Sequence, residues 1–267
     1  MFLVRVQEPK EPFPERLRRR LKGKCLTEEE VRFEGCRAVL LHWYGPPGRI
    51  PWRRITAFSA RPLPLLLPEG AVPPPGVQAA FPEEYAARLT VSAAVQCLKA
   101  AGPAARRGTV GILDPAGRAL WAAAELCPVS AALTVYTLRP ARWERLAGEL
   151  MEEAGVPVLT AGRPSDLKNT VLTVAPYPTG VFRVPAPVFA AERCPVQGAP
   201  TVNRFQPDFP PELLEKVPPG VPVLPFIGLA EERGPGRNLH DFPIKAMRIG
   251  GRAVHFRECV GELLRTP

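Results

Sequence analysis

The sequence predicts an α/β fold built on a parallel sheet. Between Gly108 and Pro176, short apolar runs typical of buried strands alternate with runs of helical periodicity. Such alternation is the pattern of βαβ units, whose strands run parallel. The chain has 267 residues, 46% hydrophobic and 23% charged, which is enough for a substantial core. In these sheets ligands bind beyond the carboxyl ends of the strands, so the pattern also predicts where a site lies.

The first strand of this segment ends abruptly. Its residues, Thr109–Leu113, are apolar, and the turn Asp114-Pro115-Ala116-Gly117 leads directly into a helical run over Arg118–Leu126. The same criteria predict a strand over Ala132–Thr137 and an amphipathic helix over Pro140–Ala154. Two further strands are expected over Val156–Thr160 and Thr170–Ala175.

The elements on either side complete the predicted domain, which spans 83–267. A helix over Glu83–Ala100 precedes the sheet, and the pattern becomes more irregular after Pro176. There we expect strands over Pro187–Ala191 and Val221–Ile227 and a short helix over Pro211–Lys216. A hairpin with a Gly250-Gly251 turn over Ala246–Phe256 and a closing helix over Arg257–Leu264 end the domain.

Residues 1–67 predict a small N-terminal α+β unit. Its expected strands are Phe2–Val6, Ala38–Trp43 and Ile55–Ser59, with a short basic helix over Glu15–Lys22. Residues 68–82 are rich in proline and predict a linker between this unit and the α/β domain.

Residues 108–176 resemble the NADP-binding, Rossmann-like half of the shikimate dehydrogenase and glutamyl-tRNA reductase type. The segment GILDPAGRA stands where that family has a glycine-rich turn after its first strand. VYTLRPARWERLAGEL stands where the family has an Asn-Arg-Thr motif followed by a helix, and SDLKNTVLTVAP where it has an aspartate, an apolar strand and Thr-Pro. The resemblance implies a Rossmann-like parallel sheet with flanking helices.

The resemblance also implies a cofactor site. Its candidate cofactor-binding residues are Asp114, Ala116, Gly117 and Arg118 at the turn, with Arg139 after the second strand. An arginine at that second place favours the 2′-phosphate of NADP, whereas an acid there binds the ribose of NAD. We therefore expect that any dinucleotide bound is NADP.

Two other interpretations of the turn stay open. A G-x-G-x-x-G turn is absent, and a carboxylate at Asp114 would repel a pyrophosphate, which indicates a Rossmann-like fold without its cofactor. Asp114 is also a natural N-cap for the helix that follows, with Pro115 at the first helical position.

The positive net charge raises the question of nucleic acid as a partner. The chain carries a net charge of +9, and residues 1–61 hold 14 Lys and Arg against 7 Asp and Glu. The run Arg16–Lys24 is compatible with weak, salt-dependent docking on nucleic acid, but Leu17 and Leu21 share one helix face and favour a solvated basic helix. We expect no specific nucleic-acid partner.

The cysteines and histidines give no sign of disulfide or metal chemistry. The six cysteines lack C-x-x-C spacing and are expected to be free thiols, and the three histidines have no zinc-site spacing, so we expect no metal. The catalytic residues, if any, are unknown. No apolar run approaches the ~20 residues of a membrane span and no signal peptide is apparent, so we expect a cytoplasmic protein.

Three functions are consistent with these observations. The first is a nucleotide- or small-molecule-binding Rossmann-like protein, with an NADP-type oxidoreductase as its enzymatic form. The second is a non-catalytic scaffold or partner-binding protein with a vestigial nucleotide site. The third is a basic protein that docks weakly on nucleic acid.

Overall fold

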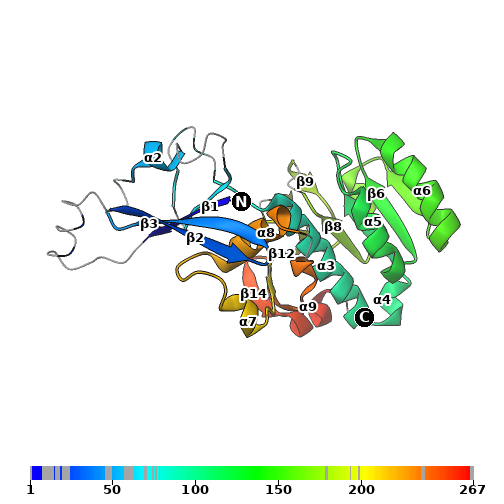
Figure 1. Cartoon of the computed structure of the whole chain (residues 1–267). Helices are drawn as coiled ribbons and strands as arrows, with labels where there is room; N and C mark the ends of the chain where they lie inside the picture. Colours follow the sequence, from blue (N-terminus) through cyan, green and yellow to red (C-terminus); the bar gives the residue numbers. More distant parts are fainter. Residues whose placement is uncertain are drawn as a thin grey trace. The chain divides into compact units, whose positions relative to one another are not determined.

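The computed structural model divides the chain into two compact units. It describes residues 2–7, 15, 19, 25–45, 50–56, 63–68, 71–73, 75, 77, 79–177, 180–192, 194–197, 199–235 and 238–264. The N-terminal unit comprises Met1–Pro82 and Phe209–Leu239, and the Rossmann-like unit comprises Glu83–Asp208 and His240–Pro267 (Figure 1).

The Rossmann-like unit is built on an eight-stranded sheet. Its strand order is β14-β13-β12-β10-β8-β5-β6-β7, and the six strands from β12 to β7 run parallel. Counted along the chain from β5, these six follow the order 3-2-1-4-5-6 of the classical dinucleotide-binding fold. The strands are β5 (Thr109–Leu113), β6 (Ala132–Tyr136), β7 (Val158–Ala161), β8 (Leu172–Ala175), β10 (Val188–Ala190), β12 (Thr201–Pro207), β13 (Ile244–Ile249) and β14 (Arg252–His255).

Central strands of this sheet are apolar because both of their faces are covered. In β5, Ile112 lies between Val135 of β6 and Val174 of β8, and none of the three side chains is exposed. The predicted strand Thr109–Leu113 has the bounds that the sequence indicated. The sheet then ends in the antiparallel hairpin of β13 and β14, whose turn is the predicted Gly250-Gly251.

Helices cover the sheet (Figure 1). The helix α3 (Glu83–Ala101) contacts β8, β10 and β12, and also packs on α5 (Leu120–Leu126) and α9 (Phe256–Leu263). The helix α6 (Pro140–Ala154) contacts α5 and β7. Gln96 of α3 fixes the neighbouring chain by accepting from the Ile244 N–H at 2.9 Å and donating to the Phe242 carbonyl at 3.1 Å.

The second half of the sheet departs from the regular βαβ pattern. The 3₁₀ helix η3 (Pro164–Asn169) connects β7 to β8. Among the described residues between β8 and β12 the only regular structure besides β10 is a pair of short parallel strands, β9 (Phe182–Arg183) and β11 (Val196–Gln197). The short helices α4 (Pro103–Arg106), η2 (Cys127–Val129) and η4 (Leu239–Asp241) complete the connections.

The N-terminal unit contains a four-stranded sheet of order β2-β3-β1-β4. Its core on one side centres on Phe226, whose ring packs edge-on against Phe2 and Phe33 at centroid distances of 5.4 and 5.2 Å. Its elements are β1 (Phe2–Gln7), β2 (Leu26–Phe33), β3 (Cys36–Trp43), α2 (Trp52–Thr56), β4 (Leu65–Leu66), α7 (Pro211–Leu214) and α8 (Val223–Arg233).

The predicted strand over Val221–Ile227 was wrong. That segment enters α8, with Pro222 as its N-cap and Pro225 in its first turn. First-turn residues donate no intrahelical hydrogen bond, so a proline is tolerated there. Residues 209–239 also belong to the N-terminal unit, although the sequence placed them in the domain 83–267.

Other differences concern residues 1–82. The strand predicted at Ile55–Ser59 was wrong in its described part, because Ile55 and Thr56 end α2. In the predicted linker 68–82, Ala71 and Val77 pack against the core of the N-terminal unit. Of the predicted basic helix Glu15–Lys22, all but Glu15 and Arg19 lies outside the described residues, as does most of Arg16–Lys24.

Two glycines test the packing of the Rossmann-like unit. A Cβ on Gly111 in β5 would lie 3.1 Å from the Thr173 Cβ and closer still to its hydroxyl, whereas a Cβ on Gly148 in α6 would meet nothing within 4 Å. Gly111→Ala is expected to lower the free energy of unfolding by about 1–3 kcal/mol, and Gly148→Ala to raise it by about 0.5–1 kcal/mol. Urea denaturation measures both, and equal effects of the two changes would contradict this packing.

Candidate functional site

The candidate site lies where the strand order reverses. From β5 the chain winds to β6 and β7 on one side, and from β8 to β10 and β12 on the other. Ligands of open α/β sheets bind at this switch point, beyond the carboxyl ends of the two central strands. Here those ends are followed by Asp114 after β5 and by Tyr177 after β8.

Asp114 is buried, with 3% of its surface exposed, and its carboxylate is fully engaged. Oδ1 accepts from the backbone N–H of Arg118 at 2.8 Å, and Oδ2 accepts from that of Ala119 at 3.0 Å. The indole N–H of the buried Trp143 in α6 donates to Oδ2 at 3.2 Å. Charge-assisted hydrogen bonds of this kind are what allows a carboxylate to be buried.

The turn itself is tight. The Gly117 N–H donates to the Asp114 carbonyl at 3.2 Å, and Gly117 has φ +68°, a left-handed conformation that favours glycine. Ala116 is exposed at the tip of the turn. The predicted N-cap role of Asp114 was therefore wrong: α5 begins at Leu120 with Ala119 as its N-cap, and Asp114 instead binds the two N–H groups just before the helix. Pro115 lies in the turn and not at the first helical position.

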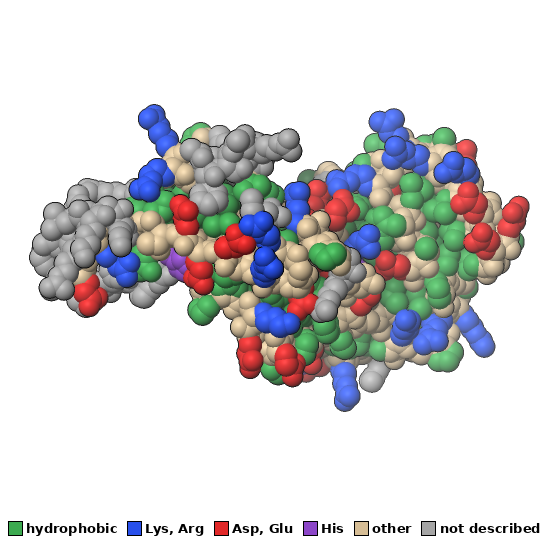
Figure 2. All heavy atoms as spheres, viewed as in Figure 1, with side chains coloured by type: hydrophobic (Ala, Val, Ile, Leu, Met, Phe, Trp, Pro, Cys, Tyr) green, Lys and Arg blue, Asp and Glu red, His purple; other side chains and the backbone are tan. Residues whose placement is uncertain are grey.

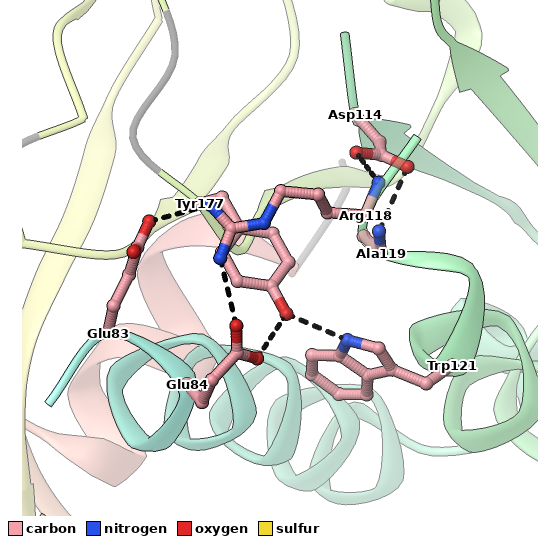
Figure 3. Close-up of polar contacts among 7 residues, drawn as sticks. All are labelled: Glu83, Glu84, Asp114, Arg118, Ala119, Trp121 and Tyr177. Atoms are coloured by element: carbon pink, nitrogen blue, oxygen red, sulfur yellow. Dashed lines mark hydrogen bonds and ion pairs between the residues drawn. The ribbon is translucent and has the colours of Figure 1, made fainter. Parts of the chain in front are cut away.

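Arg118 is held by acids from the start of α3 (Figure 3). Its guanidinium donates to Glu83 at 3.0 Å and to Glu84 at 2.8 Å, and lies over the ring of Tyr177, 4.1 Å from the centroid. Exposed ion pairs contribute little by themselves, but two separate carboxylates and an aromatic face restrict this side chain.

Tyr177 links the remaining members of this cluster. Its hydroxyl donates to the Glu84 carboxylate at 2.6 Å and accepts from the Trp121 indole N–H at 3.0 Å (Figure 3). Burial and the bond to Glu84 raise the pKa of Tyr177 to about 12. The phenol is therefore a hydrogen-bond donor at neutral pH and is poorly suited to act as a base.

Arg139 lies beside the turn. It is exposed at the N-cap of α6, and its N–H donates to the Thr137 hydroxyl at 3.0 Å. The Arg142 guanidinium donates to the Gly117 carbonyl at 3.0 Å, and a Cβ on Gly117 would lie 3.1 Å from the Arg139 Cβ. The loops after β5 and β6 are thus in direct contact.

The sequence therefore predicted residues that the fold does bring together. Asp114, Gly117 and Arg118 share one turn, and Arg139 packs over Gly117, while Ala116 points outward. Sequence reasoning missed the other members of the cluster, namely Glu83, Glu84, Trp121, Trp143 and Tyr177. Two acids at a helix start are an ordinary dipole-favoured pattern, and only the strand order places them beside Arg118.

These residues do not fit a dinucleotide pyrophosphate. In the classical site the phosphate accepts hydrogen bonds from backbone N–H groups at the turn and at the start of the following helix. Here the Arg118 and Ala119 N–H groups already donate to the Asp114 carboxylate, and Arg142 and Arg139 crowd Gly117. A pyrophosphate would have to displace a buried carboxylate of like charge.

Other candidate chemistry lies outside this cluster. The cysteines are free thiols, and hydrogen bonding to Cys259 together with burial raises the pKa of Cys97, which makes that thiol unreactive. Within the described ranges, no three His, Cys, Asp or Glu side chains are grouped as metal ligands, and no helix is long and apolar enough to cross a membrane. Acidic and basic side chains are interspersed on the visible face of the Rossmann-like unit (Figure 2).

No protein-family model matches the chain, and no curated protein matches it significantly. Among solved structures it is similar to L-tryptophan dehydrogenase from Nostoc punctiforme, with a TM-score of 0.35 and 10% identity over 87% of this chain and 74% of that one. It is also similar to Δ1-pyrroline-2-carboxylate reductase from Thermococcus litoralis, solved with NADH and L-proline, with a TM-score of 0.26 and 14% identity over 76% and 69% of the two chains.

These neighbours are a dehydrogenase and a reductase, and their likeness to this chain is distant. The strand order of the chain itself shows that the fold is α/β with a Rossmann-like parallel sheet. The resemblance to the shikimate dehydrogenase and glutamyl-tRNA reductase type rests on the sequence motifs alone.

Removing the Asp114 carboxylate is expected to destabilise the protein. Asp114→Ala should lower the free energy of unfolding by about 2–4 kcal/mol, because two backbone N–H groups and a buried indole N–H lose their acceptor. Asp166 is an exposed control, whose carboxylate accepts from the Arg163 N–H at 2.9 Å. Asp166→Ala should cost about 0.5–1 kcal/mol. Equal losses in urea denaturation would show that burial of Asp114 does not matter.

The raised pKa of Tyr177 is expected to lower the stability of the folded protein at high pH. Its pKa rises from 10.0 in the ordinary side chain to about 12 in the folded protein. The folded state therefore keeps the proton longer, so this contribution is complete below pH 10 and is lost as the pH rises towards 12. Ultraviolet titration of tyrosinate should show a step near pH 12 that Tyr177→Phe removes and Tyr44→Phe retains. Its persistence in Tyr177→Phe would contradict the assignment.

Proposed function

We propose that the chain is a non-catalytic, partner-binding protein that uses a Rossmann-like unit as a scaffold and has a vestigial nucleotide site. The observation that carries this proposal is the buried carboxylate of Asp114, which accepts from the Arg118 and Ala119 N–H groups at 2.8 and 3.0 Å. Those donors are the ones that a dinucleotide would need for its pyrophosphate.

The charges of the cluster support the same conclusion. Arg118 directly follows the turn, and both of its terminal nitrogens are bonded to carboxylates of α3. Trp121 and Tyr177 are bonded to each other, so their polar groups are also engaged. A ligand at the switch point would have to break several of these contacts before gaining its own.

A groove between α5 and α6 supports a partner-binding role. It has a volume of about 530 Å³, with apolar side chains such as Leu120, Ala124 and Leu146 along it and Arg142 and Arg145 among its polar residues. One acid, Glu149, is also present, at 3.7 Å from Arg145. A partner with an apolar face and flanking acids fits this combination.

One observation favours a second function, an NADP-type oxidoreductase. Arg139 is exposed after the second parallel strand, where an arginine binds the 2′-phosphate of NADP. Under this alternative the turn would rearrange on binding, with Asp114 leaving its N–H partners. The two functions therefore differ in whether dinucleotides bind, which can be measured directly.

Calorimetry with NADP(H) and NAD(H) distinguishes the two functions. We expect no binding tighter than about 1 mM for either cofactor, and no change in Arg139→Ala, because the pyrophosphate donors are engaged. The oxidoreductase predicts instead a preference for NADP(H) that Arg139→Ala reduces by about 10- to 150-fold, from a contact worth ~1.5–3 kcal/mol. Arg163→Ala, an exposed arginine after β7, is the matched control, and NADP(H) binding that only Arg139→Ala weakens would overturn the proposal.

A further inference from the structure

Arg5 is a buried cation in the middle of the N-terminal unit. It lies in β1 and pairs in register with Leu41 of β3, and 4% of its surface is exposed. Alternate residues of a strand share a face, so Arg5 lies on the side of Leu3 and opposite Phe2, whose ring packs on α8. The Leu3 side belongs to an apolar cluster that includes Leu41 and Ile55.

The guanidinium lacks acceptors on two of its nitrogens. Within the described part of the chain, no acceptor lies within hydrogen-bonding distance of Nε or Nη1 of Arg5, and both atoms are buried. Among the described residues, its ring contact is with Trp52 of α2, whose ring centroid is 5.8 Å from Cζ. Burial lowers the pKa of Arg5, but a guanidinium stays charged at neutral pH. A charge in this position is strongly unfavourable unless an anion accompanies it.

Nearby described acids do not supply that anion. The strand register places Glu28 opposite Leu41 and Glu30 opposite Val39, on the face that Arg5 occupies. Glu30 is engaged by Arg37, with contacts of 2.9 and 2.7 Å. Glu28 lies two strands away from Arg5, roughly 10 Å at ordinary strand spacing.

The local charge also favours an external anion. The helix α2 that brings Trp52 to Arg5 carries two exposed arginines, Arg53 and Arg54, and no acid in its first turn. Like charges beside a buried cation make it less stable without an anion, and they attract an anion from solution.

We propose that Arg5 anchors a binding site for a small oxyanion, a carboxylate or phosphate group, on the Trp52 side of the N-terminal sheet. The planar fork of the guanidinium matches both groups in bidentate geometry. This inference is independent of the proposed function, because its residues belong to the other unit.

Thermal unfolding of the full chain tests the site. The melting temperature is measured in sodium phosphate, sodium benzoate and sodium chloride at equal ionic strength, for the wild type, Arg5→Met and Arg53→Met. We expect phosphate or benzoate to raise the melting temperature of the wild type by about 2–4 °C more than that of Arg5→Met. Arg53→Met should respond as the wild type does, and general salt effects cancel in the comparison. The larger of the two shifts tells whether a phosphate or an apolar carboxylate is the better ligand.

The result in chloride alone adds a second readout. Arg5→Met should melt at the same temperature as the wild type or higher, because it removes an unneutralised buried charge. A large fall in melting temperature with no oxyanion-specific shift would overturn the proposal, since the chain itself would then neutralise Arg5. If Arg5→Met does not fold, the wild type and Arg5→Lys are titrated with benzoate by calorimetry. Saturable binding that is weaker in Arg5→Lys supports the site. Binding that does not saturate by 50 mM benzoate, on the order of ten times a ~5 mM dissociation constant, overturns the proposal.

Discussion

The carboxylate of Asp114 is the interaction on which the arrangement around the switch point depends. It follows β5 directly, accepts from two N–H groups ahead of α5 and accepts from Trp143 of α6, so one buried side chain joins three elements. A buried carboxylate is tolerated only when its oxygens are hydrogen-bonded, and these three donors meet that need. Because the same N–H groups bind phosphate in dinucleotide folds, the residue that stabilises the turn also limits what the turn can bind.

The second constraint comes from α3, which precedes the sheet in the chain but lies across its later strands. Its first turn brings Glu83 and Glu84 to Arg118, and Tyr177 joins the same cluster from the end of β8. The charge of Arg118 is therefore balanced within the protein. Exposed arginines remain at the start of α6, beside the groove between α5 and α6, and this is why we assign recognition to that surface.

The sequence predicted the regular part of this architecture because local pattern and final packing agree there. β5 and α6 have the predicted bounds, since a short apolar run and a strongly amphipathic run each have one favourable structure. β2 was missed because its three consecutive acids, Glu28–Glu30, obscure the alternation. Val221–Ile227 was misassigned to a strand because a short apolar run with prolines at a helix start does not show helical periodicity. The contacts of Glu84 with Arg118 and Tyr177 span 34 and 93 residues, and no local pattern encodes such pairs.

The amide resonances of Arg118 and Ala119 report directly on their hydrogen bonds to the Asp114 carboxylate. In a ¹H–¹⁵N spectrum of the labelled protein, both should resonate downfield as charge-assisted donors, and both should move upfield in Asp114→Ala. We expect millimolar NADP(H) to leave these two resonances unchanged in the wild type. Saturable shifts of both amides on adding NADP(H) would contradict this expectation, because they would show that a phosphate can take the place of the Asp114 carboxylate.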